Sequence, residues 1–183
     1  NNYGKDAEMY VKMINVLNDP ENENKDDEKI ITILNEGKSK FPKDYSLNVT
    51  EFNYWYYTKK DNDKAQQALQ KAIEADPTNK QLHFNIGVTY DNLSNKFHDN
   101  KDHQKAFEYM AKAVEGYQSA IEIDGEYVDA YYNLAGVFYE LNEPQKEKSC
   151  YEKILQIEPD NISAINALST LIGFTKINYN SEN

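Results

Sequence analysis

One pattern of fourteen residues occurs twice in the chain and constrains its fold more than any other feature. Residues 80–93 read KQLHFNIGVTYDNL and residues 128–141 read VDAYYNLAGVFYEL, with a small residue, Gly87 or Ala135, at the same place in each. Each copy is followed by a second helical segment that ends in similar text, AIEIDGEY after the first and ILQIEPDN after the second. The repeat therefore predicts units of two helices, each closed by a turn that contains Pro or Gly.

Three further positions recur in the second helix of each unit and in the turn after it. They are Leu34, Gly37 and Pro42; Leu69, Ala72 and Pro77; Tyr117, Ala120 and Gly125; and Tyr151, Ile154 and Pro159. Small side chains allow two antiparallel helices to approach closely, and bulky ones fill the space between neighbouring pairs. One such pair cannot bury its apolar face alone, so the units are expected to stack.

This spacing resembles that of the tetratricopeptide-repeat (TPR) family, whose unit is about 34 residues long. The resemblance implies an all-α fold: an α-solenoid of antiparallel helix pairs with about four repeats and a C-terminal capping helix. A single array over residues 1–183 is expected, with repeats at 7–42, 46–77, 80–125 and 128–159 and a solvating cap at 161–175. The first repeat departs most from the family pattern and carries an acidic loop.

The third repeat is longer than the others. Its turn residues, Pro77 and Gly125, are 48 residues apart, whereas the neighbouring intervals are 35 and 34 residues. Apolar residues continue at steps of three and four on both sides of residues 98–101, so a helical insertion of 14 residues is expected to form a projecting hairpin. Its candidate contact residues are Phe97, Phe107 and Met110. A length variation without a partner is the alternative, because surface insertions cost little free energy.

The charge balance limits the class of partner. The chain has 31 acidic and 20 basic residues, a net charge of −11, and every basic residue is Lys. Such a field repels a phosphate backbone, so no nucleic-acid partner is expected. A neutral or basic protein or peptide suits this charge better. No apolar run is long enough to span a membrane, so no membrane insertion is expected either.

The sequence contains no motif for catalysis, for a cofactor or for a metal. The phosphate-binding patterns GxxxxGK and GxGxxG are absent, so neither an enzyme nor a cofactor is predicted. His98 and His103 invite a metal interpretation, but five residues across a turn do not place two imidazoles on one helical face. The segment Asp19–Ile30 alternates acids like a calcium loop but lacks the central glycine and the final glutamate. Cys150, the single cysteine, is expected to be buried and inert.

The resemblance also implies a concave groove lined by the first helix of each pair. The residues that it places there are Glu51, Tyr54, Tyr57, Gln81, Phe84, Asn85, Val88, Asp91, Asp129, Tyr132, Asn133, Tyr139 and Glu140. Asn85 and Asn133 occupy equivalent positions, and a carboxamide both donates to and accepts from a peptide backbone. The alternative for each aromatic residue is packing between helices. No Lys stands where chaperone-binding members of the family clamp a C-terminal carboxylate, so that ligand is not expected.

The function that the resemblance implies is a non-enzymatic scaffold or adaptor that binds a peptide segment or a partner protein in this groove. Two alternatives stay open. One is the sensor or interaction portion of a larger protein, an enzyme included. The other is a self-associating array that forms a homodimer. Similar TPR proteins of the Gram-negative envelope favour the periplasm over the cytoplasm as its compartment.

Overall fold

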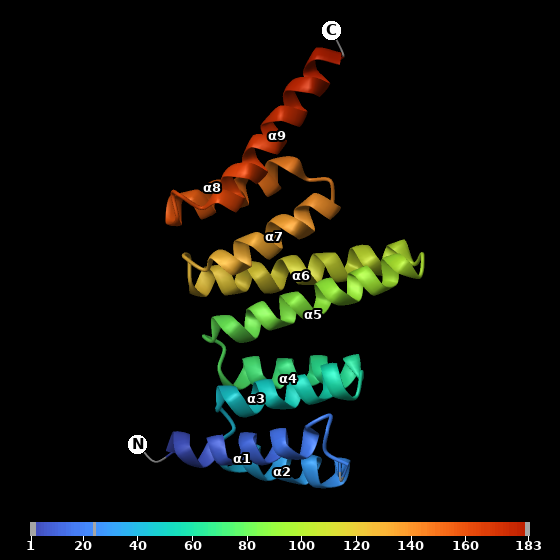
Figure 1. The fold of residues 1–183 in the computed structure, drawn as a ribbon, viewed down its shortest axis with the longest axis vertical. Coiled ribbons are helices and arrows are strands. Elements are labelled where there is room, and N and C mark those ends of the chain that lie inside the picture. Colours follow the sequence, from blue (N-terminus) through green and yellow to red (C-terminus); the bar gives the residue numbers. More distant parts are fainter. Residues whose placement is uncertain (1–2, 24, 182–183) are drawn as a thin grey trace. The chain divides into compact units, whose positions relative to one another are not determined.

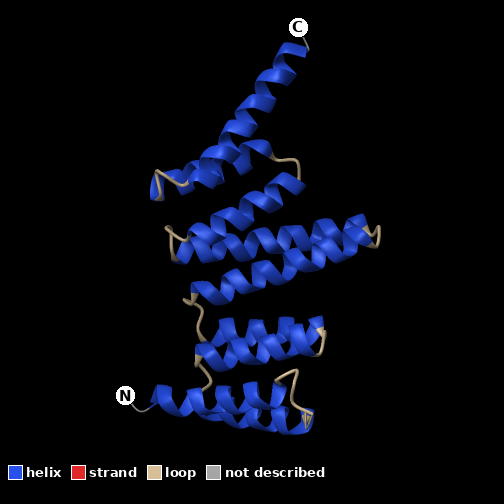
Figure 2. Cartoon of the chain, in the orientation of Figure 1, coloured by secondary structure: helices blue, strands red, loops and turns tan. Residues whose placement is uncertain are grey.

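The computed structural model describes the backbone of residues 3–23 and 25–181, and the side chains of residues 6–23 and 25–173. Among these residues the regular structure is helical throughout and no strand occurs, so the all-α prediction is confirmed (Figure 2). The helices are α1 (Tyr3–Asn18), α2 (Asp27–Lys40), α3 (Tyr45–Asn53), α4 (Asn62–Ala75), α5 (Lys80–Asp99), α6 (His103–Ile123), α7 (Val128–Glu140), α8 (Pro144–Ile157) and α9 (Ile162–Ser181). Internal contacts divide the chain into two compact units, residues 1–82 and 83–183.

The first unit contains two helix pairs, α1 with α2 and α3 with α4 (Figure 1). Tyr10 and Ile14 of α1 pack with Ile30 and Leu34 of α2 and with Leu47 of α3 in one buried cluster. The short links between these helices end in aspartates whose side chains accept a hydrogen bond from the first turn of the next helix. These N-caps are Asp26, Asp44 and Asp61, which accept from the backbone nitrogens of Lys29, Leu47 and Lys64.

A π-helical turn, η1 (Tyr54–Thr58), follows α3 and changes the register of the second repeat. The Lys59 nitrogen donates to the Tyr54 carbonyl at 3.0 Å, so one residue more is enclosed than in an α-helical turn. The interval from Pro42 to Pro77 is 35 residues, one more than the family unit of about 34. Tyr54, at the start of this turn, lies in the core, where it is 1% exposed and its hydroxyl donates to Asp27 at 2.8 Å. The prediction that Tyr54 lines a groove is therefore wrong.

The second unit contains the long hairpin α5–α6 and the shorter pair α7–α8. The helices α5 and α6 have 20 and 21 residues, whereas α7 and α8 have 13 and 14. Helix runs through both arms of the insertion, and the reversal occupies only residues 100–102. The sequence places this turn two residues earlier, at 98–101. His98 and Asp99 are helical because a hydrogen bond from the link caps the last turn of α5: the Asp102 nitrogen donates to the Phe97 carbonyl at 2.9 Å.

In three of the helix pairs, the first helix is followed by a residue with a positive φ angle. The sequence does not display this structural repeat. Lys60, Lys101 and Asn142 follow η1, α5 and α7 with positive φ angles of 56°, 61° and 54°. After α5 and α7 the next residue's nitrogen donates to the carbonyl five positions earlier, Asp102 to Phe97 and Glu143 to Phe138, as in a Schellman motif. After η1 the Asp61 nitrogen donates to the Trp55 carbonyl, which lies six positions earlier. This position is usually glycine, so the sequence alone gives little sign of the motif.

The core of the second unit joins α6, α7 and α8. Tyr117 of α6 packs with Leu134 and Phe138 of α7 and with Cys150 of α8 in one buried cluster. Burial raises the pKa of the Cys150 thiol to about 11, so the thiol stays protonated near neutral pH. Cys150 is thus buried, as the sequence predicts.

The last helix, α9, packs on α8 and buries Ala164. Ile162, Ile165 and Ile172 of the same helix are 73%, 42% and 45% exposed. The described part of this helix therefore exposes apolar as well as polar side chains, and its role as a solvating cap stays a prediction. None of the described helices is both long enough and apolar enough to cross a membrane.

Candidate partner-binding face

Helix α7 carries five of the predicted groove residues and exposes most of them. Asp129, Tyr139 and Glu140 are exposed, and Tyr139 is 72% exposed. Tyr132 is half-buried because it packs edge-on against a neighbouring ring and its hydroxyl donates to Asn161. Asn133 is also half-buried, and its amide donates to the Asp129 carbonyl one turn back at 3.0 Å. Tyr132 is thus held by contacts outside α7, whereas the Asn133 amide bonds to its own helix.

Helix α5 contributes the second side of the candidate face. Phe84 packs against Tyr117 and Tyr127, with ring centroids 5.7 and 5.2 Å apart, so much of its surface serves the core. Val88 also packs on the core cluster of this unit. Asn85 is half-buried, as is Asn133 in the equivalent position of α7. Packing between helices, the alternative for the aromatics, thus accounts for a large part of Phe84.

The predicted groove residues of the first unit have mixed environments. Tyr57 is 57% exposed and lies edge-on to Phe52. Glu51 forms an ion pair with Lys38. Gln81, at the start of α5, is half-buried. In this unit Tyr57 therefore offers the most accessible surface among the predicted residues.

Two carboxylates stand close together on the α5–α7 face. Burial and, to a smaller extent, the nearby Glu140 carboxylate raise the pKa of Asp91 to about 6, against the opposing effect of a hydrogen bond from Tyr117. The Tyr117 hydroxyl donates to Asp91 at 3.5 Å, and burial is the main cause that raises the pKa of that phenol. The face is therefore electrostatically negative at neutral pH and favours a cationic ligand group.

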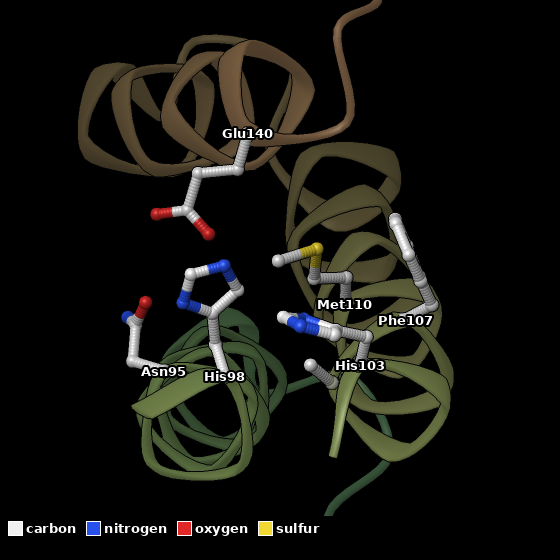
Figure 3. Close-up of a pocket in the computed structure, with 7 residues that line it drawn as sticks. Asn95, His98, His103, Phe107, Met110 and Glu140 are labelled. Carbon is white, nitrogen blue, oxygen red and sulfur yellow. The ribbon is translucent and has the colours of Figure 1, made fainter. Parts of the chain in front are cut away.

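A pocket of about 390 Å³ opens where the α5–α6 hairpin passes the end of α7. Figure 3 shows Asn95 and His98 from α5, His103, Phe107 and Met110 from α6, and Glu140 projecting from α7 toward His98. The imidazole centroids of His98 and His103 are 5.2 Å apart, with the rings nearly perpendicular. The two imidazoles do not share one helical face, but they lie close together because the three-residue reversal brings the end of α5 beside the start of α6.

No metal site follows from this proximity. Within the described part of the chain, no three His, Cys, Asp or Glu side chains are arranged to hold a metal ion. The pocket combines two imidazoles, one carboxylate and an apolar wall, which is a set of groups suited to an organic ligand group with a positive charge.

The three residues predicted as hairpin contacts differ in exposure. Phe97 is half-buried and stacks on Tyr109, with ring centroids 5.2 Å apart and an interplanar angle of 6°. Phe107 is 56% exposed, whereas Met110 is 4% exposed and belongs to the core cluster. Met110 is therefore not a projecting contact residue, although part of its side chain lines the pocket.

The family is established by sequence profiles of the tetratricopeptide repeat. One such profile matches residues 82–159 and another matches residues 55–79, together more than half of the chain. The chain belongs to the tetratricopeptide-repeat family. No curated protein matches the chain.

Solved TPR structures resemble the chain at low sequence identity. The first TPR domain of Spaghetti (RPAP3), bound to the HSP90 peptide SRMEEVD, has a TM-score of 0.52 and 23% identity, covering 68% of this chain and 89% of that chain. MamA has a TM-score of 0.59 and 20% identity, covering 81% and 78%. The human IFIT1 dimer with m7Gppp-AAAA has a TM-score of 0.64 and 20% identity, covering 81% and 33%. These structural similarities confirm the TPR-like helical fold. At sequence identities of 20–23% they show the fold and not the function.

Proposed function

We propose that the chain is a non-enzymatic adaptor that binds a peptide segment of a partner protein along α5 and α7. The observation that carries the proposal is the pair of equivalent, half-exposed carboxamides, Asn85 and Asn133, on two successive first helices. Each can donate to and accept from the backbone of an extended segment. TPR arrays use surfaces of this kind for binding, and two RPAP3 domains of similar fold carry bound chaperone peptides in their structures.

The ligand is a neutral or basic segment. Asp91, Asp129 and Glu140 give the face a negative charge, which disfavours acidic peptides such as SRMEEVD. The same charge opposes nucleic acid, so the cap analogue in the IFIT1 structure is not a guide to the ligand of this chain. The exposed Tyr139 adds rigid apolar contact area beside these acids.

Selection from a random peptide library displayed on phage tests this proposal. The full chain should enrich peptides of neutral or positive net charge. For an enriched peptide, Asn85→Ala combined with Asn133→Ala should weaken binding by about 1–3 kcal/mol, because backbone hydrogen bonds to the ligand are lost. The matched control is Asn35→Ala with Asn166→Ala, two exposed asparagines on α2 and α9, which should leave the affinity unchanged.

Circular dichroism of both double variants must remain that of the parent chain for this comparison to hold. Equal affinity of the two double variants would place peptide binding elsewhere on the molecule. Enrichment of acidic peptides would contradict the charge argument.

Self-association is the second candidate function, and the exposed isoleucines of α9 favour it. Ile162, Ile165 and Ile172 form apolar surface that a second copy can bury. Sedimentation equilibrium of the chain and of its Ile165→Glu variant distinguishes the two functions. A dimer that the substitution dissociates supports self-association, and a monomer at all concentrations refutes it.

A further inference from the structure

The size of the hairpin pocket suits one side chain rather than a large cofactor. Its volume of about 390 Å³ lies near the lower end of the range of roughly 300–1,000 Å³ typical of small-ligand sites. The end of α5, the start of α6 and the end of α7 enclose it, and it adjoins the proposed binding face through Glu140. A peptide lying along α5 and α7 can therefore extend one side chain into it.

The walls combine the three features that a guanidinium group requires. Glu140 supplies a carboxylate on one side (Figure 3). The imidazole rings of His98 and His103 lie across from it, with a nitrogen-bearing edge of the His98 ring turned toward Glu140 (Figure 3), and their π-faces are the stacking surfaces of the pocket. Phe107 and Met110 supply an apolar wall for the methylene stem. A planar, charged group on an aliphatic stem satisfies all three features, because guanidinium groups stack on rings and pair with carboxylates.

The charge at this place is unbalanced within the chain. Across residues 6–23 and 25–173, no lysine forms an ion pair with Glu140. The two lysines of α6 have other partners: Lys105 lies over Phe97 at 5.2 Å and pairs with Asp102, and Lys112 lies over Tyr109 at 5.1 Å. The Glu140 carboxylate acts on the neighbouring Asp91 as an uncompensated like charge and, second to burial, raises its pKa.

We propose that this pocket accepts an arginine side chain from the segment bound along α5 and α7, so the inference rests on the proposed function. Arginine suits the site better than lysine, because an ammonium group is compact, strongly hydrated and unable to stack. An anionic side chain is disfavoured by the Glu140 carboxylate, which lines the pocket. The chain itself contains no arginine, so a guanidinium in the pocket comes from the partner.

The test uses the full chain and a small probe, N-acetyl-arginine N-methylamide, followed by NMR. Its neutral isostere, N-acetyl-citrulline N-methylamide, is the comparison ligand. The arginine probe should shift the Met110 methyl signal and the imidazole C–H signals of His98 and His103 in a saturable way. Its affinity should exceed that of the citrulline probe by about tenfold, since a charge-assisted hydrogen bond is replaced by a neutral one.

Glu140→Gln should reduce the affinity for the arginine probe by about tenfold for the same reason. The matched control is Glu143→Gln, which removes an exposed carboxylate three residues away that pairs with Lys146. It changes the net charge equally and should leave probe binding unaltered. Equal effects of the two substitutions would overturn the proposal, because the attraction would then be a general effect of net charge.

Four further results distinguish failure of the arginine pocket from failure of the proposed function. Equal binding of the arginine and citrulline probes overturns the arginine pocket. Saturation of the same signals by Zn²⁺, with no response to the arginine probe, also overturns it. Because the probe is too small to reach Asn85 and Asn133 together, its failure alongside successful peptide selection leaves the proposed function intact. Failure of peptide selection with a normal probe response overturns the proposed function alone.

Discussion

Gly116 of α6 lies so close to Gly87 of α5 that a Cβ atom on Gly116 would be 2.7 Å from the Gly87 nitrogen. A Cβ atom on Gly87 would in turn be 2.7 Å from the buried Tyr117 ring. The two helices are therefore in backbone contact at this point, with the aromatic ring packed against the gap. Gly87 is the small residue of the sequence repeat, so the contact supports the register assigned to that repeat.

This contact predicts a difference between two glycine substitutions. Gly116→Ala should lower the free energy of unfolding by about 1–3 kcal/mol, because the new methyl group meets backbone that cannot move aside. Gly136→Ala on α7 is the control, since its Cβ would meet nothing within 4 Å. It should leave stability unchanged or raise it by about 0.5–1 kcal/mol, as expected for a glycine in a helix. Urea unfolding measures both, and equal effects would contradict the close contact.

Asp91 predicts a dependence of stability on pH. Its pKa is about 6 in the folded chain against an ordinary value of 3.8, so the folded state disfavours its ionised form. The stability that Asp91 contributes is full below about pH 4 and is lost as the pH rises through about 6. Asp91→Asn removes this loss and keeps an acceptor for Tyr117. At pH 7.5 the variant should be more stable by about 1 kcal/mol, after allowance for partial exposure.

The difference between Asp91→Asn and the parent chain should be near zero at about pH 4 and reach a plateau above about pH 6. Chemical unfolding at a series of pH values measures it. In the Glu140→Gln background the rise should occur at lower pH, because the like charge that raises the pKa of Asp91 is gone. If the difference in unfolding free energy between Asp91→Asn and the parent chain did not change with pH, the raised pKa of Asp91 would be refuted.

The π-helical turn predicts that one residue can be removed from the second repeat. Deleting the exposed Tyr57 should convert η1 into regular α-helix and change the free energy of unfolding by about 1 kcal/mol or less. Deleting the exposed Gln67 of α4 is the control, because it rotates half of an α-helix by about 100° and exposes its buried face. Far-UV circular dichroism and thermal unfolding compare the two. If both deletion variants lost cooperative unfolding to the same extent, the π-helical turn would not be an α-helical turn with one additional residue.

The sequence predicts the parts of the fold that depend on apolar periodicity. The continuous helices of the hairpin follow from apolar steps of three and four through Phe97 and Met110, and the close contact at Gly87 follows from the repeat. The π-helical turn after α3 could not be predicted in the same way. Its only trace in the sequence is one extra residue between Pro42 and Pro77.

The candidate site could be predicted only in part. The positions of Asn85 and Asn133 follow from the family pattern, and whether they bind a ligand stays a prediction. The hairpin pocket could not be found from helical spacing, because His98 and His103 meet across a reversal that uses positive φ at Lys101. The trace in the sequence is the segment HDNKDH, in which two histidines flank a short turn.

The hairpin can be tested separately from the rest of the array. Deleting residues 95–108 removes 14 residues and leaves arms close in length to α7 and α8. The shortened chain should stay folded, because repeat units contact mainly their neighbours. It should also lose the response to the arginine probe, since most of the pocket is removed. Circular dichroism and the NMR titration measure the two effects, and a chain that no longer unfolds cooperatively would show that the hairpin supports the core.

Chemical-shift mapping of a library-selected peptide on the isotope-labelled full chain tests whether a peptide binds along the first helices. The largest perturbations should fall on α5 and α7, at Asn85, Asn133 and Tyr139, and extend to Glu140 at the mouth of the hairpin pocket. Perturbations confined to α9, or to the exposed faces of α6 and α8, would contradict peptide binding along the first helices.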